Sequence, residues 1–375
     1  MPVALEIQLV AVVVAVTCAL VGVFLVLRRM ALMSDAISHS ILLGIVAGFF
    51  LAGGLASPLP ILGAAAVGLL TVWLVELVRS TGLVKEDAAI GLVFPALFSV
   101  AVLLIARYAD QVHLDTDAVL LGELAFAPFR RAVVFGVDLG PRSLWVMLAV
   151  LAVVIAFVTL FFKELKITTF DPALAATLGF SPGLLHYAFM GLVSVTAVGA
   201  FDTVGSILVV ALMIAPPAAA YLLTDRLTVL LPLAAALGAV SAIAGFWMAV
   251  VADASIAGSM ATFAGVVFLA AFLLAPERGL LARARRRARQ RVEFATLMLT
   301  VHVLHHEGTE AAREENRVEH LEEHLRWSPA FARRIVERGT ERGLLDVGRE
   351  GRLSLTERGR RTAHRILETG ETLPL

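Results

Sequence analysis

Asp35 and His39 could do chemistry together, because they lie four positions apart within the apolar stretch 30–48. Residues four apart share one face of a helix. An ionisable group at the centre of a membrane-spanning helix costs about 2.5–3.5 kcal/mol on insertion scales unless it faces a partner or a water-filled path. The spacing therefore indicates either a hydrogen-bonded pair inside a bundle or a pair that faces a transport path, and we favour the path.

The chemistry that suits such a pair is transient binding of a transition metal ion. One carboxylate with one imidazole fits Mn²⁺, Fe²⁺ or Zn²⁺ better than Ca²⁺, which prefers ligands made only of oxygen. Two side chains bind weakly, as an ion that must leave again requires. Asp202, in AFDTVGS, is a third candidate for this path, with a loop residue near the outer face as the alternative. We expect no permanently bound cofactor.

Membrane-spanning helices are the elements that would position these residues. The chain is 59% hydrophobic, and its apolar runs predict about nine crossings of an all-α polytopic membrane protein. With nine crossings the basic residues between runs fall on one side, except for four arginines in the long outer segment 107–142. This predicts a cytoplasmic C-terminus and an N-terminus outside. The apolar patch 118–129 is expected to pack as a short outer helix without crossing.

The distribution of charge divides the chain in two. Residues 1–276 hold 11 Lys and Arg against 15 Asp and Glu, whereas residues 277–375 hold 20 against 16. We therefore predict a transmembrane domain at 1–276, a basic linker at 277–293 and a cytoplasmic domain at 294–375. A basic cluster next to a membrane is expected to contact anionic membrane lipids.

Three stretches carry a resemblance to a known family: RRMALMSDAISHSILLGIVAG at 28–48, TTFDPALAATLGFSP at 168–182 and AFDTVGSILVVALMIAPPAAAYLLTDRL at 200–227. The chain resembles the permease subunit of the manganese, zinc and iron class of bacterial ATP-binding-cassette (ABC) importers. With the matching spans, the resemblance covers nearly all of residues 5–275. It implies an inner-membrane protein whose second helix supplies Asp35 and His39 to the metal path.

The resemblance also implies that a short cytoplasmic helix within residues 170–180 docks on an ATPase subunit. The residues agree with a helix there, because Asp171 is a plausible N-cap, Pro172 suits the first helical position and Gly179 suits the stop. A surface loop is the alternative. The residues assigned to this coupling helix are Phe170, Asp171, Pro172, Ala175, Ala176, Leu178 and Gly179.

The sequence contains no GxxxxGK[ST] phosphate loop, so this chain is not expected to be an enzyme. By the resemblance, ATP hydrolysis belongs to a separate ATP-binding subunit. The resemblance further implies an extracytoplasmic metal-binding protein and a second permease copy or a paralogue.

The basic tail predicts the order helix, helix, helix, strand, strand, helix, with helices near 294–306, 319–326 and 328–342. This is a small α+β winged-helix arrangement that resembles the DNA-binding half of iron- and manganese-dependent repressors. The resemblance would offer Arg333, Arg334 and Arg338 to DNA. The glutamate-rich segment 307–323 would repel phosphates, and the residues after the wing are too few for the repressors' dimerisation domain. DNA binding stays open, and we favour a protein-contact or regulatory role.

Histidines of the tail offer one more candidate site. His302 with His306, and His320 with His324, have the spacing that can hold a divalent ion on one helix face. Solvated helix histidines are the alternative to a sensor of cytoplasmic metal.

Taken together, the residues and the resemblance predict the permease subunit of an ATP-driven importer of divalent transition metals. Manganese is favoured, and zinc or iron remain open. The alternatives are a membrane-bound metal-sensing regulator and an ion-coupled secondary transporter.

Overall fold

The computed structural model describes residues 2–52, 57, 59–108, 124–134, 137–309, 316–321 and 325–369. The chain forms two compact units, Met1–Gly279 and Leu280–Leu375.

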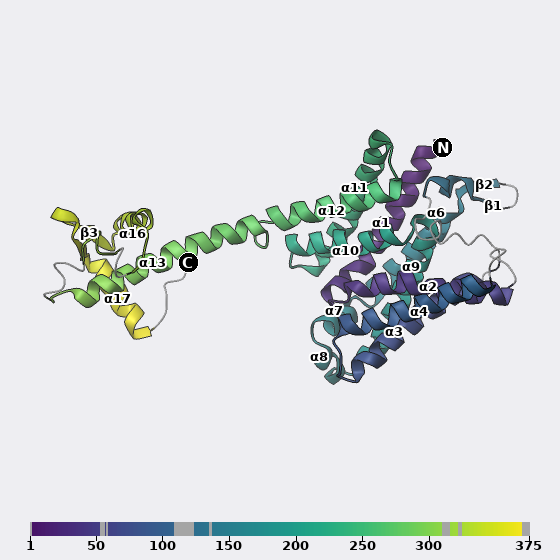
Figure 1. Ribbon diagram of the computed structural model, residues 1–375, viewed down its shortest axis with the longest axis horizontal. Helices are drawn as coiled ribbons and strands as arrows, with labels where there is room; N and C mark the ends of the chain where they lie inside the picture. Colours follow the sequence, from purple (N-terminus) through teal and green to yellow (C-terminus); the bar gives the residue numbers. More distant parts are fainter. Residues whose placement is uncertain are drawn as a thin grey trace. The chain divides into compact units, whose positions relative to one another are not determined.

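The first unit is a helix bundle (Figure 1). Within its described residues, nine helices are long and apolar enough to cross a membrane, which confirms the predicted polytopic all-α class. They are α1 (Val3–Leu27), α2 (Ala31–Ala52), α3 (Leu59–Ser80), α4 (Glu86–Tyr108), α6 (Arg142–Leu160), α9 (Pro182–Val204), α10 (Ser206–Leu223), α11 (Leu227–Ala252) and α12 (Ile256–Leu274).

Helix α1 lies in the core of this unit because its sequence is apolar on every face, and most of its residues are buried. Small residues let its neighbours approach closely. A Cβ added at Gly22 would lie 2.0 Å from the Met213 carbonyl oxygen of α10, and one at Gly238 of α11 would lie 3.1 Å from the Ala15 carbonyl oxygen. Such backbone proximity is how helices pack in lipid, where no hydrophobic effect drives them together.

The segment between α4 and α6 contains a 3₁₀ helix, η1 (Leu124–Phe129), and an antiparallel hairpin of β1 (Arg131–Val134) and β2 (Val137–Pro141). The predicted short helix at 118–129 is therefore present over Leu124–Phe129, and residues 118–123 lie outside the described residues. The hairpin was not predicted. Its sequence signal was the valines on either side of Gly136.

Two short helices, α7 (Phe162–Phe170) and α8 (Pro172–Thr177), connect α6 to α9. Only α8 was predicted. Lys163 and Lys166, two of the basic residues between the spans, lie on α7.

The second unit contains α13 (Leu280–His306), α16 (Pro329–Glu341), β3 (Leu345–Val347), a 3₁₀ turn η2 (Arg349–Gly351), β4 (Leu353–Leu355) and α17 (Glu357–Thr369). Strands β3 and β4 are antiparallel, with Leu345 opposite Leu355. The order helix, strand, strand, helix is the predicted one, and α16 lies within the expected 328–342. The helix expected at 319–326 falls partly outside the described residues, and the winged-helix assignment stays a prediction.

Buried aliphatic side chains from α13, α16 and the two strands form a core of the second unit's own, including Leu299, Val303, Ile335 and Leu353. Residues 280–293 of the expected basic linker form the first half of α13. Glu293 on this helix is buried and accepts a hydrogen bond from the Arg342 guanidinium at 2.8 Å.

Candidate functional site

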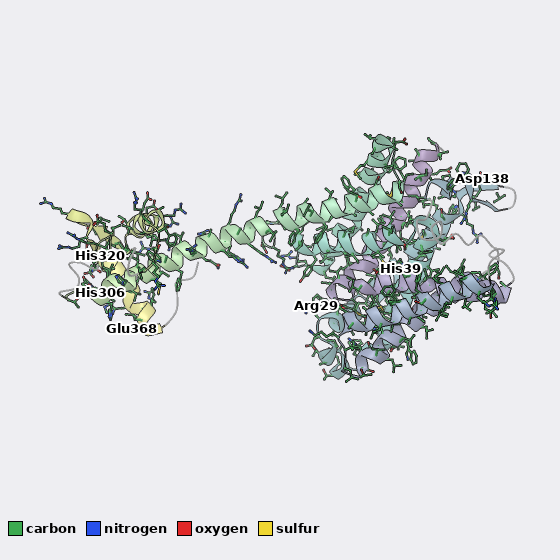
Figure 2. All side chains as sticks on the ribbon, viewed as in Figure 1. Arg29, His39, Asp138, His306, His320 and Glu368 are labelled. Carbon is green, nitrogen blue, oxygen red and sulfur yellow. The ribbon has the colours of Figure 1, made fainter. Side chains whose placement is uncertain are left out.

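Asp35 and His39 lie on one face of α2 (Figure 2 labels His39). The distance from His39 Nε2 to Asp35 Oδ1 is 3.4 Å, and the two side chains are 30% and 39% exposed, respectively. The His39 ring also contacts Phe94 and Phe98 of α4, with centroid separations of 5.9 and 6.1 Å. The pair is therefore held on its apolar side and keeps an open side where an ion could reach both a carboxylate and an imidazole.

The hydroxyl groups of the serines near this pair have hydrogen-bond partners within the helix bundle. Ser34 and Ser38 donate to carbonyl oxygens of their own helix. Ser40 contacts the Thr71 hydroxyl of α3 at 2.6 Å, and both residues are buried. These hydroxyls position α2 and leave ligand chemistry to Asp35 and His39.

Glycines set the distance between α2 and α3. A Cβ added at Gly44 would lie 2.2 Å from the Gly63 carbonyl oxygen, and one at Gly48 would lie 2.6 Å from the Leu59 carbonyl oxygen. Gly44 and Gly48 form the spacing GxxxG, which allows two helix backbones to touch. The position of His39 over α4 thus depends on packing one turn further along α2.

Asp202 is not brought into this site. It lies in the last turn of α9, its side chain is 79% exposed, and it pairs with Arg130 Nη1 at 3.5 Å. Across the part of the chain that the structure describes, no three His, Cys, Asp or Glu side chains gather in a group that could hold a metal ion. Asp202, Asp35 and His39 therefore do not form one ligand cluster, in contrast to a path that all three would line together.

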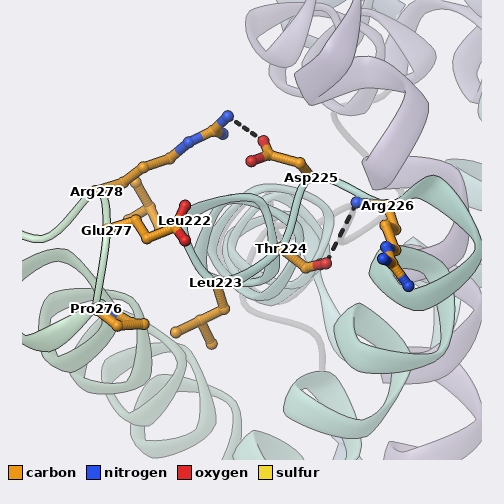
Figure 3. A pocket seen from close by; sticks show the side chains of 8 residues that line it. All are labelled: Leu222, Leu223, Thr224, Asp225, Arg226, Pro276, Glu277 and Arg278. Carbon is orange, nitrogen blue, oxygen red and sulfur yellow. Dashed lines mark hydrogen bonds and ion pairs between the residues drawn. The ribbon is translucent and has the colours of Figure 1, made fainter. Parts of the chain in front are cut away.

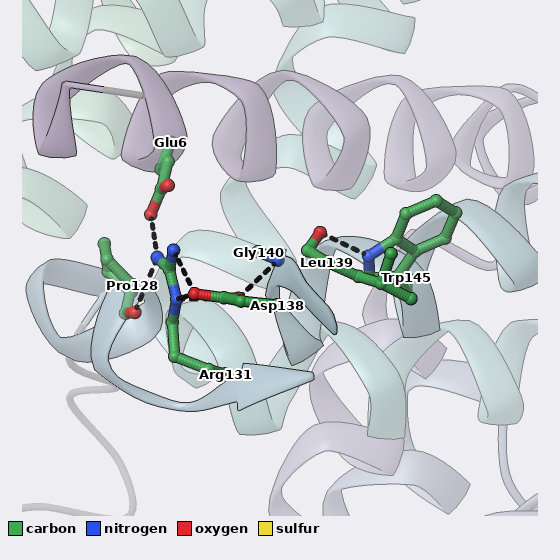
Figure 4. Close-up of polar contacts among 7 residues, drawn as sticks. All are labelled: Glu6, Pro128, Arg131, Asp138, Leu139, Gly140 and Trp145. Carbon is green, nitrogen blue, oxygen red and sulfur yellow. Dashed lines mark hydrogen bonds and ion pairs between the residues drawn. The ribbon is translucent and has the colours of Figure 1, made fainter. Parts of the chain in front are cut away.

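Arg131, the residue after Arg130, forms an ion-pair cluster that the sequence did not predict (Figure 4). Its guanidinium pairs with the buried Glu6 of α1 at 2.8 Å and with Asp138 of β2 at 2.7 Å. The hydrogen bonds from Arg131 and from the Gly140 N–H lower the pKa of the Asp138 carboxyl. The residues are too far apart in sequence for local spacing to show that they meet. The cluster fastens the start of α1 to the hairpin.

Helix α8 has the ends that its sequence predicted. The Asp171 side chain accepts a hydrogen bond from the Leu174 N–H at 2.9 Å, with Pro172 at the first position. Gly179 has φ +86°, and the N–H groups of Gly179 and Phe180 bond back to the Ala176 and Ala175 carbonyls. This is a Schellman stop. The helix proper is Pro172–Thr177, so Phe170 belongs to α7, and Leu178 and Gly179 form the cap.

Large apolar side chains stand exposed around α8. Phe170, Leu174 and Leu178 are 62%, 48% and 57% exposed, whereas Ala175 is fully buried against the bundle. Ala176 is exposed beside them. Exposed apolar side chains that gather on a surface are a feature of protein interaction sites.

Arg278 anchors the chain after the last span (Figure 3). It donates to the Tyr221 carbonyl oxygen at 3.1 Å, lies 4.7 Å from the Tyr221 ring centroid and pairs with Asp225. A shallow pocket lies beside this contact, lined by residues 222–226 and 276–278. We assign it no ligand. Its role is to hold the end of α12 to the turn between α10 and α11.

The His302–His306 pair and the candidate arginines of the tail lie on different helices. The His302 and His306 rings lie 4.6 Å apart on α13 (Figure 2 labels His306 and His320), and His324 lies outside the described residues. Arg333 and Arg334 are exposed on α16. Arg338 pairs with Glu341 at 3.0 Å.

Comparison with known proteins agrees with this architecture. Residues 2–275 match the model of the "ABC 3 transport family". The chain is 50% identical, over 94% of its length and 95% of the relative, to "Zinc transport system membrane protein TroD" of Treponema pallidum (strain Nichols). It is 47% identical, over 76% of its length and 96% of the relative, to "Manganese transport system membrane protein MntD" of Bacillus subtilis (strain 168).

A solved structure gives the same result. "PsaBC from Streptococcus pneumoniae in complex with Fab" superposes with a TM-score of 0.62 at 29% identity, covering 74% of this chain and 94% of that one. The resemblance that the three stretches carried is thereby confirmed. The chain belongs to the ABC 3 transport family of membrane permeases.

Proposed function

We propose that this chain is the membrane permease of an ATP-driven importer and that Asp35 and His39 bind Mn²⁺ or Zn²⁺ in transit. The observation that carries the proposal is the carboxylate–imidazole pair on α2, which is about one-third exposed in a largely apolar helix. Relatives named for zinc and for manganese transport support both ions equally. As a permease, the chain is a transport component and not a catalyst.

The open side of the pair supports a second permease copy or a paralogue that completes the path. Asp35 and His39 are about one-third exposed in one chain, although ionisable groups in the membrane normally face a partner or water. A facing helix from another copy would enclose the ion. Asp202 then acts near the outer end of the unit, through Arg130, and not as a ligand beside His39.

The exposed apolar surface of α8 supports docking on an ATP-binding subunit. The surface consists of Phe170, Leu174 and Leu178, at the end of α1 opposite to Glu6 and the hairpin. An extracytoplasmic binding protein would deliver the ion at the hairpin end. In this orientation the N-terminus is outside and the C-terminus is cytoplasmic, as the positions of the basic residues also favour.

Uptake of radioactive Mn²⁺ and Zn²⁺ tests the proposal in a host without its own importers that also expresses the ATP-binding subunit and the binding protein. His39→Ala is expected to lower uptake about 10-fold or more, since even outer-shell partners of a metal site are worth about 10–100-fold in affinity. Leu32→Ala, at an exposed position of the same helix, is the matched control. Full uptake by His39→Ala, at normal membrane abundance, would refute the assignment of the path.

A further inference from the structure

The Arg28 guanidinium is held by groups of a different kind from those that hold three other arginines of the first unit. Arg79, Arg131 and Arg278 each pair with a carboxylate. The Arg28 guanidinium instead donates to two hydroxyls, from Nε to Thr169 Oγ1 at 3.1 Å and from Nη2 to Thr168 Oγ1 at 3.3 Å. Among the described residues, no carboxylate lies within ion-pair distance of it.

The surroundings of Arg28 are partly apolar. Its guanidinium carbon lies 5.0 Å from the centroid of the Phe189 ring on α9, and the same ring packs edge-on against Phe24 of α1. Loss of hydration lowers the pKa of Arg28 to about 10, which leaves the group charged at neutral pH. A charged group with neutral partners can change those partners without leaving a buried carboxylate unpaired.

The backbone connects Arg28 rigidly to the start of α2. Only residues 28–30 separate α1 from α2, and their N–H groups bond back to carbonyls in the last turn of α1. Arg29 has φ +62°, a left-handed conformation that costs a non-glycine residue free energy and persists only in a constrained turn. A displacement of the Arg28 side chain is therefore carried into the first turn of α2, directly before the turn on which Asp35 lies.

The two threonines that accept hydrogen bonds from Arg28 lie next to the surface that we propose for docking on the ATP-binding subunit. Thr168 and Thr169 are in the last turn of α7, directly before Phe170 and the exposed surface of α8. Thr168 is buried and also donates to the Glu164 carbonyl oxygen at 2.8 Å, so the hydroxyl that meets Arg28 is fixed to α7. Arg28 thus spans the segment that would meet the ATP-binding subunit and the helix that carries the metal pair.

We propose that Arg28 is a positioning residue that couples movement of α7 and α8 to α2, and so couples ATP hydrolysis to the state of the Asp35–His39 pair. This inference rests on the proposed function. When α8 moves, the two hydroxyls move with it and pull or release the guanidinium, which shifts the first turn of α2. Arg28 does not touch the ion.

The test measures ATP hydrolysis and metal uptake in the same proteoliposomes, with the whole importer reconstituted and ⁵⁴Mn²⁺ or ⁶⁵Zn²⁺ as the probe. Arg28→Met removes the donors and keeps the length of the side chain. The double variant Thr168→Val with Thr169→Val removes the acceptors and keeps the side-chain shape. Both are expected to lower the number of ions moved per ATP by about fivefold or more, the lower end of measured couplings between sites, while hydrolysis continues.

Two controls separate coupling from folding. Arg29→Gln removes a neighbouring charge that makes no side-chain hydrogen bond among the described residues, and it should keep the wild-type ratio. Thr168→Ser with Thr169→Ser keeps both hydroxyls and should restore the ratio that the valines lower. A merely structural role would lower hydrolysis and uptake together and would not distinguish serine from valine.

The outcomes are distinct. An unchanged ratio in Arg28→Met, or an equal loss in the serine and valine variants, would overturn the role of Arg28 and leave the proposed function standing. Failure of the wild-type importer to show ATP-dependent uptake of either ion would refute the proposed function, and the inference with it.

Discussion

Some polar side chains of this bundle are placed to bind an ion, and others hold its helices and loops together. Asp35 and His39 form a partly exposed pair, whereas Asp202 forms an ion pair with Arg130 at the end of α9. The difference lies in their neighbours. Phe94 and Phe98 cannot compete for the His39 nitrogens, while a guanidinium satisfies a carboxylate. A carboxylate in an apolar stretch can therefore be assigned to a metal path only when the side chains around it are known.

Asp138 makes the hairpin sensitive to acid. Its pKa in the folded protein is lowered, first by the hydrogen bonds from Arg131. A lowered pKa means that the carboxylate stabilises the hairpin above the usual Asp value of about 3.9, and that this stabilisation is lost as the pH falls through the lower, folded-state pKa. The hairpin should be insensitive to pH between about 5 and 7 and should loosen only below about 4.

Trp145 reports this change, because its indole N–H donates to the Leu139 carbonyl oxygen of the hairpin at 2.9 Å. A variant with Trp145 as its only tryptophan should show a fluorescence transition in acid, and Asp138→Asn should already show the loosened signal at neutral pH. A transition that persists unchanged in Asp138→Asn would assign it to another group.

At the scale of elements, the contact of α2 with α3 decides where the metal pair lies. Gly44 has the Gly63 backbone where a Cβ would be, so Gly44→Ala must push the helices apart. We expect a loss of about 1–3 kcal/mol of stability, as for other overpacked cores, and reduced metal uptake. Gly91→Ala on α4 is the control, because a Cβ there meets open space. Thermal unfolding in detergent measures the first effect, and equal midpoints for the two variants would contradict the argument.

Helix α8 carries a second prediction at this scale. Leu174→Glu places a charge in the exposed apolar surface without touching the caps at Asp171 and Gly179. Binding of the ATP-binding subunit should weaken by about 2 kcal/mol or more, as when a central interface side chain is lost. Leu83→Glu makes the same change at a leucine that is 88% exposed in the turn after α3. Copurification of the subunit with each variant checks the result, and equal recovery would exclude α8 as the docking site.

The whole molecule combines a transport unit with a tail that only some relatives share. The match to TroD spans 94% of the chain, which requires most of Leu280–Leu375, whereas the match to MntD spans 76% of the chain and nearly all of MntD. Because the match leaves little of MntD for a tail of this size, we propose that transport by this chain does not need its tail. The tail's own core and its His302–His306 pair support a regulatory role as our proposal.

Deletion of residues 280–375 tests this division. The remaining unit keeps Arg278 and its contact with Asp225, so the end of α12 stays anchored. We expect ATP-dependent uptake to persist and its response to cytoplasmic metal to change, measured as uptake rate against internal Mn²⁺ or Zn²⁺. If the shortened chain no longer associates with the ATP-binding subunit, the tail is structural and the regulatory proposal fails.

The sequence alone determined the features that depend on neighbouring residues. Hydropathy over about 20 residues identified the spans, a spacing of four put Asp35 and His39 on one face, and the types of Asp171 and Gly179 marked the ends of α8. Each is local, because helix periodicity and capping act within a few residues.

Only the tertiary structure decided which distant residues meet. It paired Arg131 with Glu6, 125 positions away, separated Asp202 from His39 and set Arg28 against Thr168. The sequence of an apolar span does not indicate which helices it packs against, since lipid-facing and core-facing leucines look alike in sequence. Small residues such as Gly44 permit close contact, but the helix that fills the space is chosen by the packing of the whole bundle.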